Sequence, residues 1–192
     1  MSPTPPNSDQ LRQVHELNRL FLTYLQTRVG ADRDCLGLPD GARSTLRKTS
    51  AEELAAIAEF PRALFDLALD DRTAPHVRDP LPSRDDAARH ALCLTILLCA
   101  WTLSRQSAYH ARLLLGLEPR AIQRLRAMRL SDLQQLAHVR QLVLCAFAGR
   151  DWIWTELLTD TRPEARQQLA LVALQPGLAH DWPERRATHR GP

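Results

Sequence analysis

The chain has 192 residues, of which 44% are hydrophobic and 24% charged, a composition that supports a buried core and excludes a disordered chain. Leucine and alanine abound while aromatic residues make up only 5%, which favours helix over sheet. The formal net charge of +3 is too small to indicate a nucleic-acid partner by itself. It is uneven, with residues 1–80 at −2 (10 basic, 12 acidic) and residues 81–192 at +5 (15 basic, 10 acidic), so an anionic partner would meet the second half.

The first predicted helix follows a short polar stretch. Residues 1–8 are rich in Pro, Ser and Thr and are expected to form a disordered tail without the features of a secretory signal. Ser8 or Asp9 is expected to cap the helix, and Gly30 to stop it. Its apolar residues recur at three- and four-residue steps, as on one face of an amphipathic helix: Leu11, Val14, Leu17 or Asn18, Phe21, Tyr24 and Leu25.

A second helical stretch follows the Leu-Gly-Leu sequence of residues 36–38. Ser50, with Glu53 three residues on, forms a capping-box pattern that predicts the start of a helix. Pro61 is expected either to kink this helix or to begin a separate one. The apolar residues that the helix carries are Leu54, Ile57 and Ala58.

A linker is predicted at residues 71–83, which contain three prolines and no apolar period. Ser83, with Asp86 three residues on, is expected to start the next helix, which runs to about Leu103 and weakens over residues 104–107. The apolar run at residues 91–103 is too short to span a bilayer and is typical of a core helix.

Three further helices are expected toward the C-terminus. Ser131 with Gln134 predicts a helix start ahead of Leu136, Val139 and Val143. Residues 151–158 favour a short helix, and Thr161 with Glu164 caps another one that runs to about Leu174. Helix, short turn and helix is the outline of a helix-turn-helix, although most helical hairpins of this length bind nothing. Residues 176–192 are expected to be an exposed tail.

The sequence also contains an internal similarity. Residues 36–68 align without a gap onto residues 115–147, at a constant offset of 79, with eight identities in 33 positions. We interpret this as a duplication, which must be recognised before any fold is assigned. The identical pairs are Leu36/Leu115, Gly37/Gly116, Leu38/Leu117, Ala42/Ala121, Leu46/Leu125, Arg47/Arg126, Leu54/Leu133 and Ala58/Ala137.

The apolar helix of the second half and the stretch that follows it resemble FlhD, the helical subunit of the bacterial flagellar master transcriptional activator. The resemblance covers residues 90–175 as a whole FlhD subunit and residues 11–68 as a truncated one, and it continues through residues 152–174 into the helix-turn-helix-like end of the family. The matching positions are Leu115-Gly116-Leu117, Leu125, Leu133, Leu136-Ala137 and Gln141-Leu142-Val143.

This resemblance implies an all-α fold of two tandem FlhD-like repeats, one at residues 9–70 and one at residues 84–175. Because FlhD is a homodimer, the duplication implies a single-chain pseudo-dimer with one C-terminal helix-turn-helix-like segment. The family acts with a second, zinc-binding subunit (FlhC-like) that contacts DNA, so such a subunit is an expected partner. The family's cross-linking cysteine would fall at Leu144, one position before Cys145, so no intersubunit disulfide is inferred for Cys145.

Candidate DNA-binding residues are arginines in two groups. Arg120, Arg124, Arg126 and Arg129 lie within ten residues without an acidic residue among them and could contact phosphates, or could simply be a solvated face. Arg162 and Arg166 flank the start of the last helix and could lie at a groove of DNA, although Asp160 and Glu164 dilute their charge.

Candidate partner-binding residues are Trp152 and Trp154, which cannot both face one core from the same helix. One of them is expected to be exposed and available to a partner protein; the alternative is that both pack at the edge of the core.

Neither a metal, a cofactor nor an enzymatic activity is expected from the motifs. The four cysteines lie in or beside apolar stretches and predict reduced, buried thiols of a cytoplasmic protein. His90 and Cys93 could form half of a metal site, but Cys99 lies too far round the helix to complete it. No phosphate-binding, nucleotide-binding or hydrolase motif is present.

Two functions are expected from these patterns. The first is an FlhD-like transcriptional regulator that acts in a protein complex at promoter DNA. The alternative is an adaptor or anti-activator of FlhD ancestry, in motility or secretion, that has lost contact with DNA. In either case we expect the helices at residues 11–25 and 94–103 to bury against each other, so that Leu98→Asp would unfold the chain or cause it to aggregate.

Overall fold

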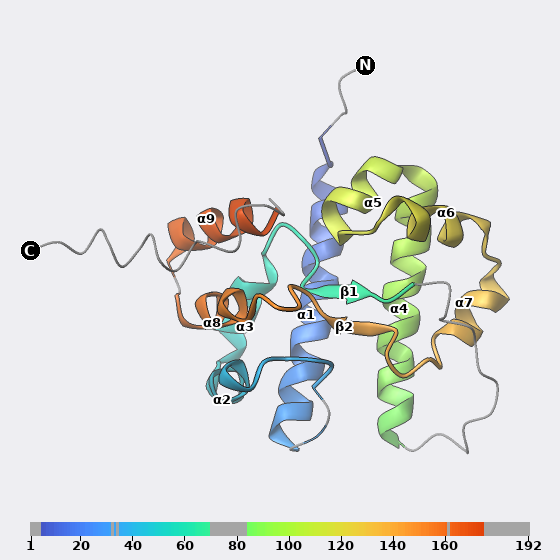
Figure 1. Cartoon of the computed structure of the whole chain (residues 1–192). Coiled ribbons are helices and arrows are strands. Elements are labelled where there is room, and N and C mark those ends of the chain that lie inside the picture. Colours follow the sequence, from blue (N-terminus) through green and yellow to red (C-terminus); the bar gives the residue numbers. More distant parts are fainter. Residues whose placement is uncertain (1–4, 32, 34, 70–83, 161, 175–192) are drawn as a thin grey trace, which may run out of the picture.

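The computed structural model describes residues 5–31, 33, 35–69, 84–160 and 162–174. These residues form nine helices and one sheet of two short strands, so the fold is helical as predicted (Figure 1). The predicted linker at residues 71–83 and the tail at residues 176–192 lie outside the described residues. The elements are α1 (Ser8–Gly30), α2 (Asp40–Lys48), α3 (Ala51–Ala58), β1 (Phe65–Leu67), α4 (Arg84–Gln106), α5 (Ala108–Leu115), α6 (Pro119–Ala127), α7 (Leu130–Leu136), β2 (Val143–Cys145), α8 (Asp151–Thr159) and α9 (Pro163–Leu174).

Helix α1 is the amphipathic helix that the apolar spacing predicts. Its start is capped by Asn7, whose side chain accepts from the N–H of Gln10, so the predicted caps Ser8 and Asp9 are wrong by one and two positions. Gly30 is the last helical residue instead of the one beyond it. The buried residues of the helix are Val14, Leu17, Asn18, Phe21, Leu22, Leu25 and Val29.

Asn18 is the polar exception on this buried face and holds the loop that follows α3. Its amide nitrogen lies 3.0–3.2 Å from the carbonyl oxygens of Ala58, Phe60 and Arg62, and its side-chain oxygen accepts from the N–H of Leu64 at 2.9 Å. The fully buried side chain thereby satisfies backbone groups that have left the helix.

Two predicted helix boundaries in the first half have different outcomes. The capping box of Ser50 and Glu53 is confirmed at the start of α3. The expectation for Pro61 is wrong, because α3 ends at Ala58 and the chain then enters β1 without a kink or a new helix. The strand escaped prediction because three residues, Phe65, Asp66 and Leu67, are too few to show an alternating pattern.

Helix α4 is the core helix that its apolar run predicts. It spans Arg84–Gln106, so its Ala87–Gln106 segment is long and apolar enough to cross a membrane by length and composition alone. Within this segment, whose apolar window is 39% buried, the residues Ile96, Leu97 and Ala100 are fully buried in the protein core. Ser83 lies outside the described residues, while Ser107 ends the weakened stretch by capping α5.

Helix α7 begins two residues earlier than predicted. Its N-cap is Arg129, whose backbone N–H donates to the Asp132 carboxylate at 2.8 Å, so the pattern of Ser131 and Gln134 lies inside the helix and is not its cap. The helix ends at Leu136, and Val143 belongs to β2, which corrects the expectation that Val139 and Val143 continue it.

The two strands join the two halves of the chain. β1 pairs antiparallel with β2, with Phe65 opposite Cys145, Asp66 opposite Leu144 and Leu67 opposite Val143. The backbone exchange extends beyond the strands, since the N–H of Cys145 donates to Leu36 at 2.7 Å and the N–H of Ala63 donates to Leu114 at 2.8 Å. Each half thus donates a backbone hydrogen bond to the start of the other half's Leu-Gly-Leu turn. Leu36 is the first residue of one turn, and Leu114 directly precedes the other.

The spacing of the elements follows the offset of 79 found in the sequence. α2 and α6 begin and end 79 positions apart, α3 and α7 begin 79 apart, and Gly37 and Gly116 both adopt positive φ, of 80° and 68°. The strand ladder maps onto itself, because shifting Phe65 and Cys145 by 79 gives the pair of Leu144 and Asp66. A duplication predicts this arrangement, and common ancestry of the halves stays a prediction.

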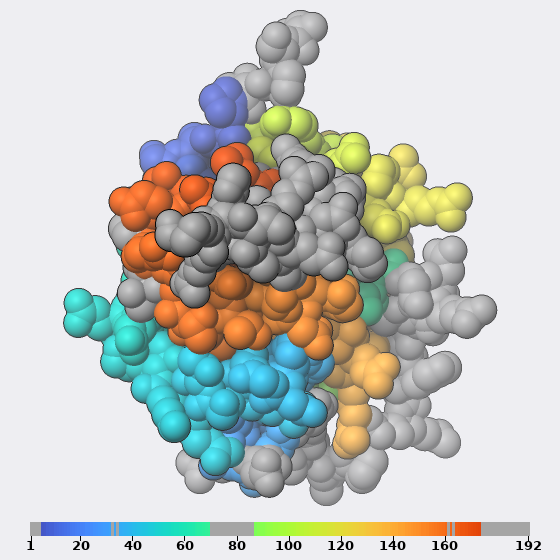
Figure 2. Space-filling model, turned by 60° about the vertical axis from the view of Figure 1, so that its left-hand side comes forward, coloured from blue at the N-terminus to red at the C-terminus, as the bar shows by residue number. Residues whose placement is uncertain are grey.

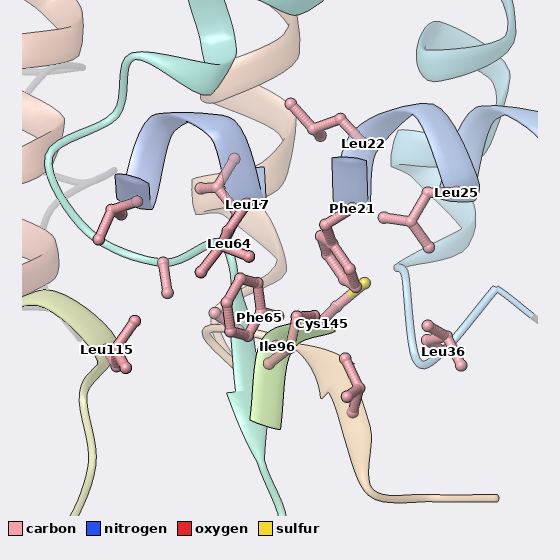
Figure 3. Close-up of a cluster of buried hydrophobic side chains, with 14 of the residues drawn as sticks. Leu17, Phe21, Leu22, Leu25, Leu36, Leu64, Phe65, Ile96, Leu115 and Cys145 are labelled. Carbon is pink, nitrogen blue, oxygen red and sulfur yellow. The ribbon is translucent and has the colours of Figure 1, made fainter. Parts of the chain in front are cut away.

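The core lies where α1, α4 and the strands meet (Figure 3). Phe21 of α1 packs edge-on against Phe65 of β1, with ring centroids 5.6 Å apart, and Ile96 and Cys145 lie beside them. The direct contact between α1 and α4 is limited, because the strands fill much of the space between them (Figure 1). Leu98 is only half-buried, whereas Leu97 is fully buried.

Candidate functional site

The C-terminal helices α8 and α9 pack on the first half of the chain. α8 contacts α2 and α9, and in Figure 2 the orange surface of this segment adjoins the cyan surface of α2 and α3. Trp154 anchors α8, because its side chain is 1% exposed and its indole N–H donates to the carbonyl of Ala146 at 2.8 Å. The segment is therefore fixed to the body of the protein.

Of the two expectations for the tryptophans, the one in which both pack against the core agrees with the structure, and the one in which a tryptophan is exposed does not. Trp154 is buried and cannot reach a partner. Trp152 is half-buried and packs against the core, so it can contribute at most an edge to a partner surface. The large hydrophobic residue that the described part of α8–α9 presents to solvent is Leu171, which is 64% exposed and which the sequence did not single out.

The outward face of α9 is not basic. Glu164, Gln167 and Gln168 are exposed beside Leu171. Arg162 is exposed, but its guanidinium is bound to the Asp160 carboxylate at 2.6 and 3.0 Å, and these hydrogen bonds raise its pKa. The charge that a helix-turn-helix would aim at a groove is thus already partnered.

Arg166 is turned toward the first half. It is half-buried and close enough to Glu53 of α3 to contribute to the lowering of that residue's pKa, which comes first from hydrogen bonds with Ser50. Its position on α9 favours a role in docking the helix over one in contacting an external ligand.

The four arginines at the α6–α7 junction are more accessible. Arg120, Arg126 and Arg129 are exposed and Arg124 is half-buried. The guanidinium of Arg126 lies 3.5 Å from the carbonyl of Arg105, which brings an exposed arginine from the end of α4 to the group. We call these five residues the basic cluster: Arg105, Arg120, Arg124, Arg126 and Arg129.

Arg105 was missed by the sequence reasoning because it is 15 positions from Arg120 and separated from it by α5. The junction is held in place by Trp101, whose indole N–H donates to the carbonyl of Met128 at 3.1 Å, while the Arg105 guanidinium lies over the Trp101 ring at 4.8 Å. The two predicted arginine groups are not brought together, since α6 and α9 lie on opposite sides of the molecule (Figure 1).

Arg62 is a second residue that the sequence did not indicate. Its guanidinium donates to the carbonyl of Ala173 at 3.3 Å, lies over the ring of Phe147 and is 4.0 Å from the Asp66 carboxylate. Burial lowers the pKa of Arg62 and raises that of Asp66, although each partially offsets the shift of the other. Arg62 thus connects the first half to the end of α9.

The cysteines are free thiols: Cys35, Cys93 and Cys145 are buried and Cys99 is half-buried. The carbonyl of Cys35 accepts the Cys145 thiol at 3.6 Å, so Cys145 is engaged in the interface between the halves. His90 stacks on His138 with centroids 4.2 Å apart instead of turning to Cys93. Among the described residues no three His, Cys, Asp or Glu side chains converge as a metal site would need.

The second half of the chain matches a known family. Residues 84–176 match the family model described as flagellar transcriptional activator (FlhD). No curated protein and no solved structure matches the chain significantly. The matched range begins with α4 and includes the basic cluster, β2 and the α8–α9 segment.

Proposed function

Because residues 84–176 form an FlhD-type unit, we propose that the chain is a subunit of a cytoplasmic transcriptional regulator that acts in a protein complex at promoter DNA. The family match is the observation that carries this proposal, since the family is one of flagellar transcriptional activators. The surface charge adds to it, because the basic cluster belongs to the matched half.

The basic cluster is the part of the surface that faces DNA in this proposal. Arginine guanidinium groups bind phosphate oxygens in bidentate geometry, and each neutralised phosphate contributes through release of counterions. Three of the four arginines predicted from the sequence are exposed here, and Glu118 and Asp132 are the exposed carboxylates closest to them along the chain. Asp132 is already engaged in capping α7.

The α8–α9 segment faces a protein partner in this proposal. Leu171 is a large apolar side chain in solvent, surrounded on its helix by uncharged glutamines, which suits a protein surface better than phosphates. A second regulator subunit of the zinc-binding, FlhC-like kind is the partner that the family suggests. Docking of Arg162 and Arg166 in a DNA groove has less support, since the Arg162 guanidinium is bound to Asp160 and Arg166 is half-buried.

The two halves, residues 9–70 and 84–175, form a single-chain pseudo-dimer in this proposal. The offset of 79 in α2 and α6, and a strand ladder that maps onto itself under that offset, support it. Such a chain would carry one C-terminal segment where a homodimer carries two.

The alternative function is an adaptor without DNA contact, and the outward face of α9, which carries Glu164 and no exposed basic residue in its described part, favours it. Binding of a fluorescent DNA duplex as a function of salt separates the two. A variant with Gln at positions 120, 124, 126 and 129 should lower the slope of log K against log salt by up to about four, because up to four phosphate contacts are lost. A control with Arg12→Gln and Lys48→Gln should keep the slope. An unchanged slope in the four-residue variant would exclude the cluster and favour the adaptor.

A further inference from the structure

Two hollows lie along the surfaces of the long helices α1 and α4. The first, of about 620 Å³, is mostly apolar; the second, of about 520 Å³, is mostly polar. The apolar hollow is lined by Glu16, Arg19, Leu20, Thr23, Tyr24 and Thr27 of α1 and by Ala88, Ala91, Leu92 and Thr95 of α4.

The offset of 79 relates the two hollows to each other. Subtracting 79 from the four α4 positions of the apolar hollow gives Asp9, Arg12, Gln13 and Glu16, which all line the polar hollow. Adding 79 to Thr27 gives Gln106, which also lines the polar hollow. The hollows are therefore equivalent places in the two halves of the fold, filled with different side chains.

The two hollows differ at one pair of equivalent positions that lie on α1 and α4. In the polar hollow the Gln13 amide donates to the Cys99 thiol at 3.6 Å and links α1 to α4. The equivalent positions in the apolar hollow are Leu92 and Leu20. Leu92 is 8% exposed, but Leu20 remains 50% exposed. The polar hollow is thus linked within the chain, while the apolar one leaves a large hydrophobic side chain in water.

We propose that the apolar hollow is a contact surface between two copies of this chain, related by a two-fold axis. Such an interface uses the same patch on both copies and must therefore be complementary to itself. Leu20 supplies a projecting side chain, and the small residues Thr23, Ala88 and Ala91 line the space that receives the Leu20 of the other copy.

The charges at the rim also complement themselves. Glu16 and Arg19 line the apolar hollow, and neither forms an ion pair with another residue in the described part of the chain. Across a two-fold axis, Glu16 of one copy meets Arg19 of the other, twice in each interface. A nucleic acid does not suit this surface, because Glu16 and the mostly apolar lining oppose phosphate binding.

Sedimentation equilibrium of the purified full chain tests the proposal. The unmodified chain should dimerise, and Leu20→Arg should raise the dissociation constant by about tenfold or more, because a charge would be buried in the apolar hollow. Leu130→Arg is the matched control, since Leu130 is 53% exposed on α7, and it should leave the dimer intact. A chain that stays monomeric, or a Leu20→Arg variant that dimerises normally, would overturn the proposal.

A charge exchange separates this contact from a general effect on folding. Glu16→Arg and Arg19→Glu should each weaken the dimer through repulsion of like charges, and the double variant should restore it. Circular dichroism should be the same for all three variants, because both side chains lie on the surface. Failure of the double variant to recover the dimer would exclude the pairing of Glu16 with Arg19 across the two-fold axis.

Discussion

Arg62 of the first half lies against Gly116 of the second, so close that a Cβ atom at position 116 would collide with the guanidinium. Gly116 has positive φ, as Gly37 does, but a Cβ at Gly37 would meet no atom within 4 Å. The same Leu-Gly-Leu turn therefore has two environments, and only the second-half turn receives a side chain from the other half.

Gly116→Ala should destabilise the protein more than Gly37→Ala. Both substitutions cost about 1 kcal/mol for a side chain at positive φ. Gly116→Ala adds about 1 kcal/mol, because the displaced Arg62 guanidinium loses its hydrogen bond to the carbonyl of Ala173. Chemical denaturation measures both values. In an Arg62→Ala background the difference between the two glycine variants should disappear; its persistence would show that Arg62 is not its cause.

Asn18→Ala should lower the free energy of unfolding by about 2–4 kcal/mol. The substitution leaves the N–H of Leu64 and the carbonyl of Arg62 without their buried partner, and each unsatisfied group costs about 1–3 kcal/mol. Asn18→Asp separates the two contributions, because the aspartate keeps the acceptor for the N–H of Leu64 and loses the donor to the carbonyl of Arg62. A loss below about 1 kcal/mol for Asn18→Ala would mean that water replaces the amide.

Leu97→Asp should abolish folding, since Leu97 is fully buried in the core. Leu98→Asp, which the helical pattern alone would choose, should be milder because Leu98 is half-buried. Far-ultraviolet circular dichroism and gel filtration of both variants measure this order. Equal damage from the two substitutions would contradict the orientation of α4.

The buried thiol of Cys93 should make the folded protein less stable at alkaline pH. Burial raises its pKa from 9.0 to about 11, so the folded state holds the thiol proton more tightly than the unfolded state does. Below pH 9 both states are protonated and the thiol contributes nothing to the pH dependence. Between pH 9 and 11 the unfolded state alone ionises, so the free energy of unfolding should fall by about 2–3 kcal/mol. Cys93→Ala should lack that part of the decline, and an equal decline in both proteins would contradict the assignment.

The sequence predicted most helices, because their apolar periods and capping patterns are local. It failed where two local patterns compete. At α7 the pattern of Ser131 and Gln134 and the pair of Arg129 and Asp132 both fit a helix start, and the second is used. The strands were missed because Phe65–Leu67 and Val143–Cys145 are stabilised by pairing with each other, at a mean sequence separation of 78 positions, and not by their neighbours in the chain.

The candidate site was predicted only in part for the same reason. The exposed arginines of α6 follow from local sequence, but Arg105 joins them through the packing of α6 against α4. The burial of Trp154 and the partial burial of Arg166 depend on where α8 and α9 dock on the first half, which no local pattern specifies.

The most direct test of the central claim is chromatin immunoprecipitation of the tagged chain from its native cell, where its partners are present. The proposed function predicts enrichment at promoters of motility genes, and loss of that enrichment when Arg120, Arg124, Arg126 and Arg129 are all changed to Gln. The control with Arg12→Gln and Lys48→Gln should retain it. Absence of promoter enrichment for the unmodified chain, with expression confirmed, would contradict a role at DNA and favour the adaptor.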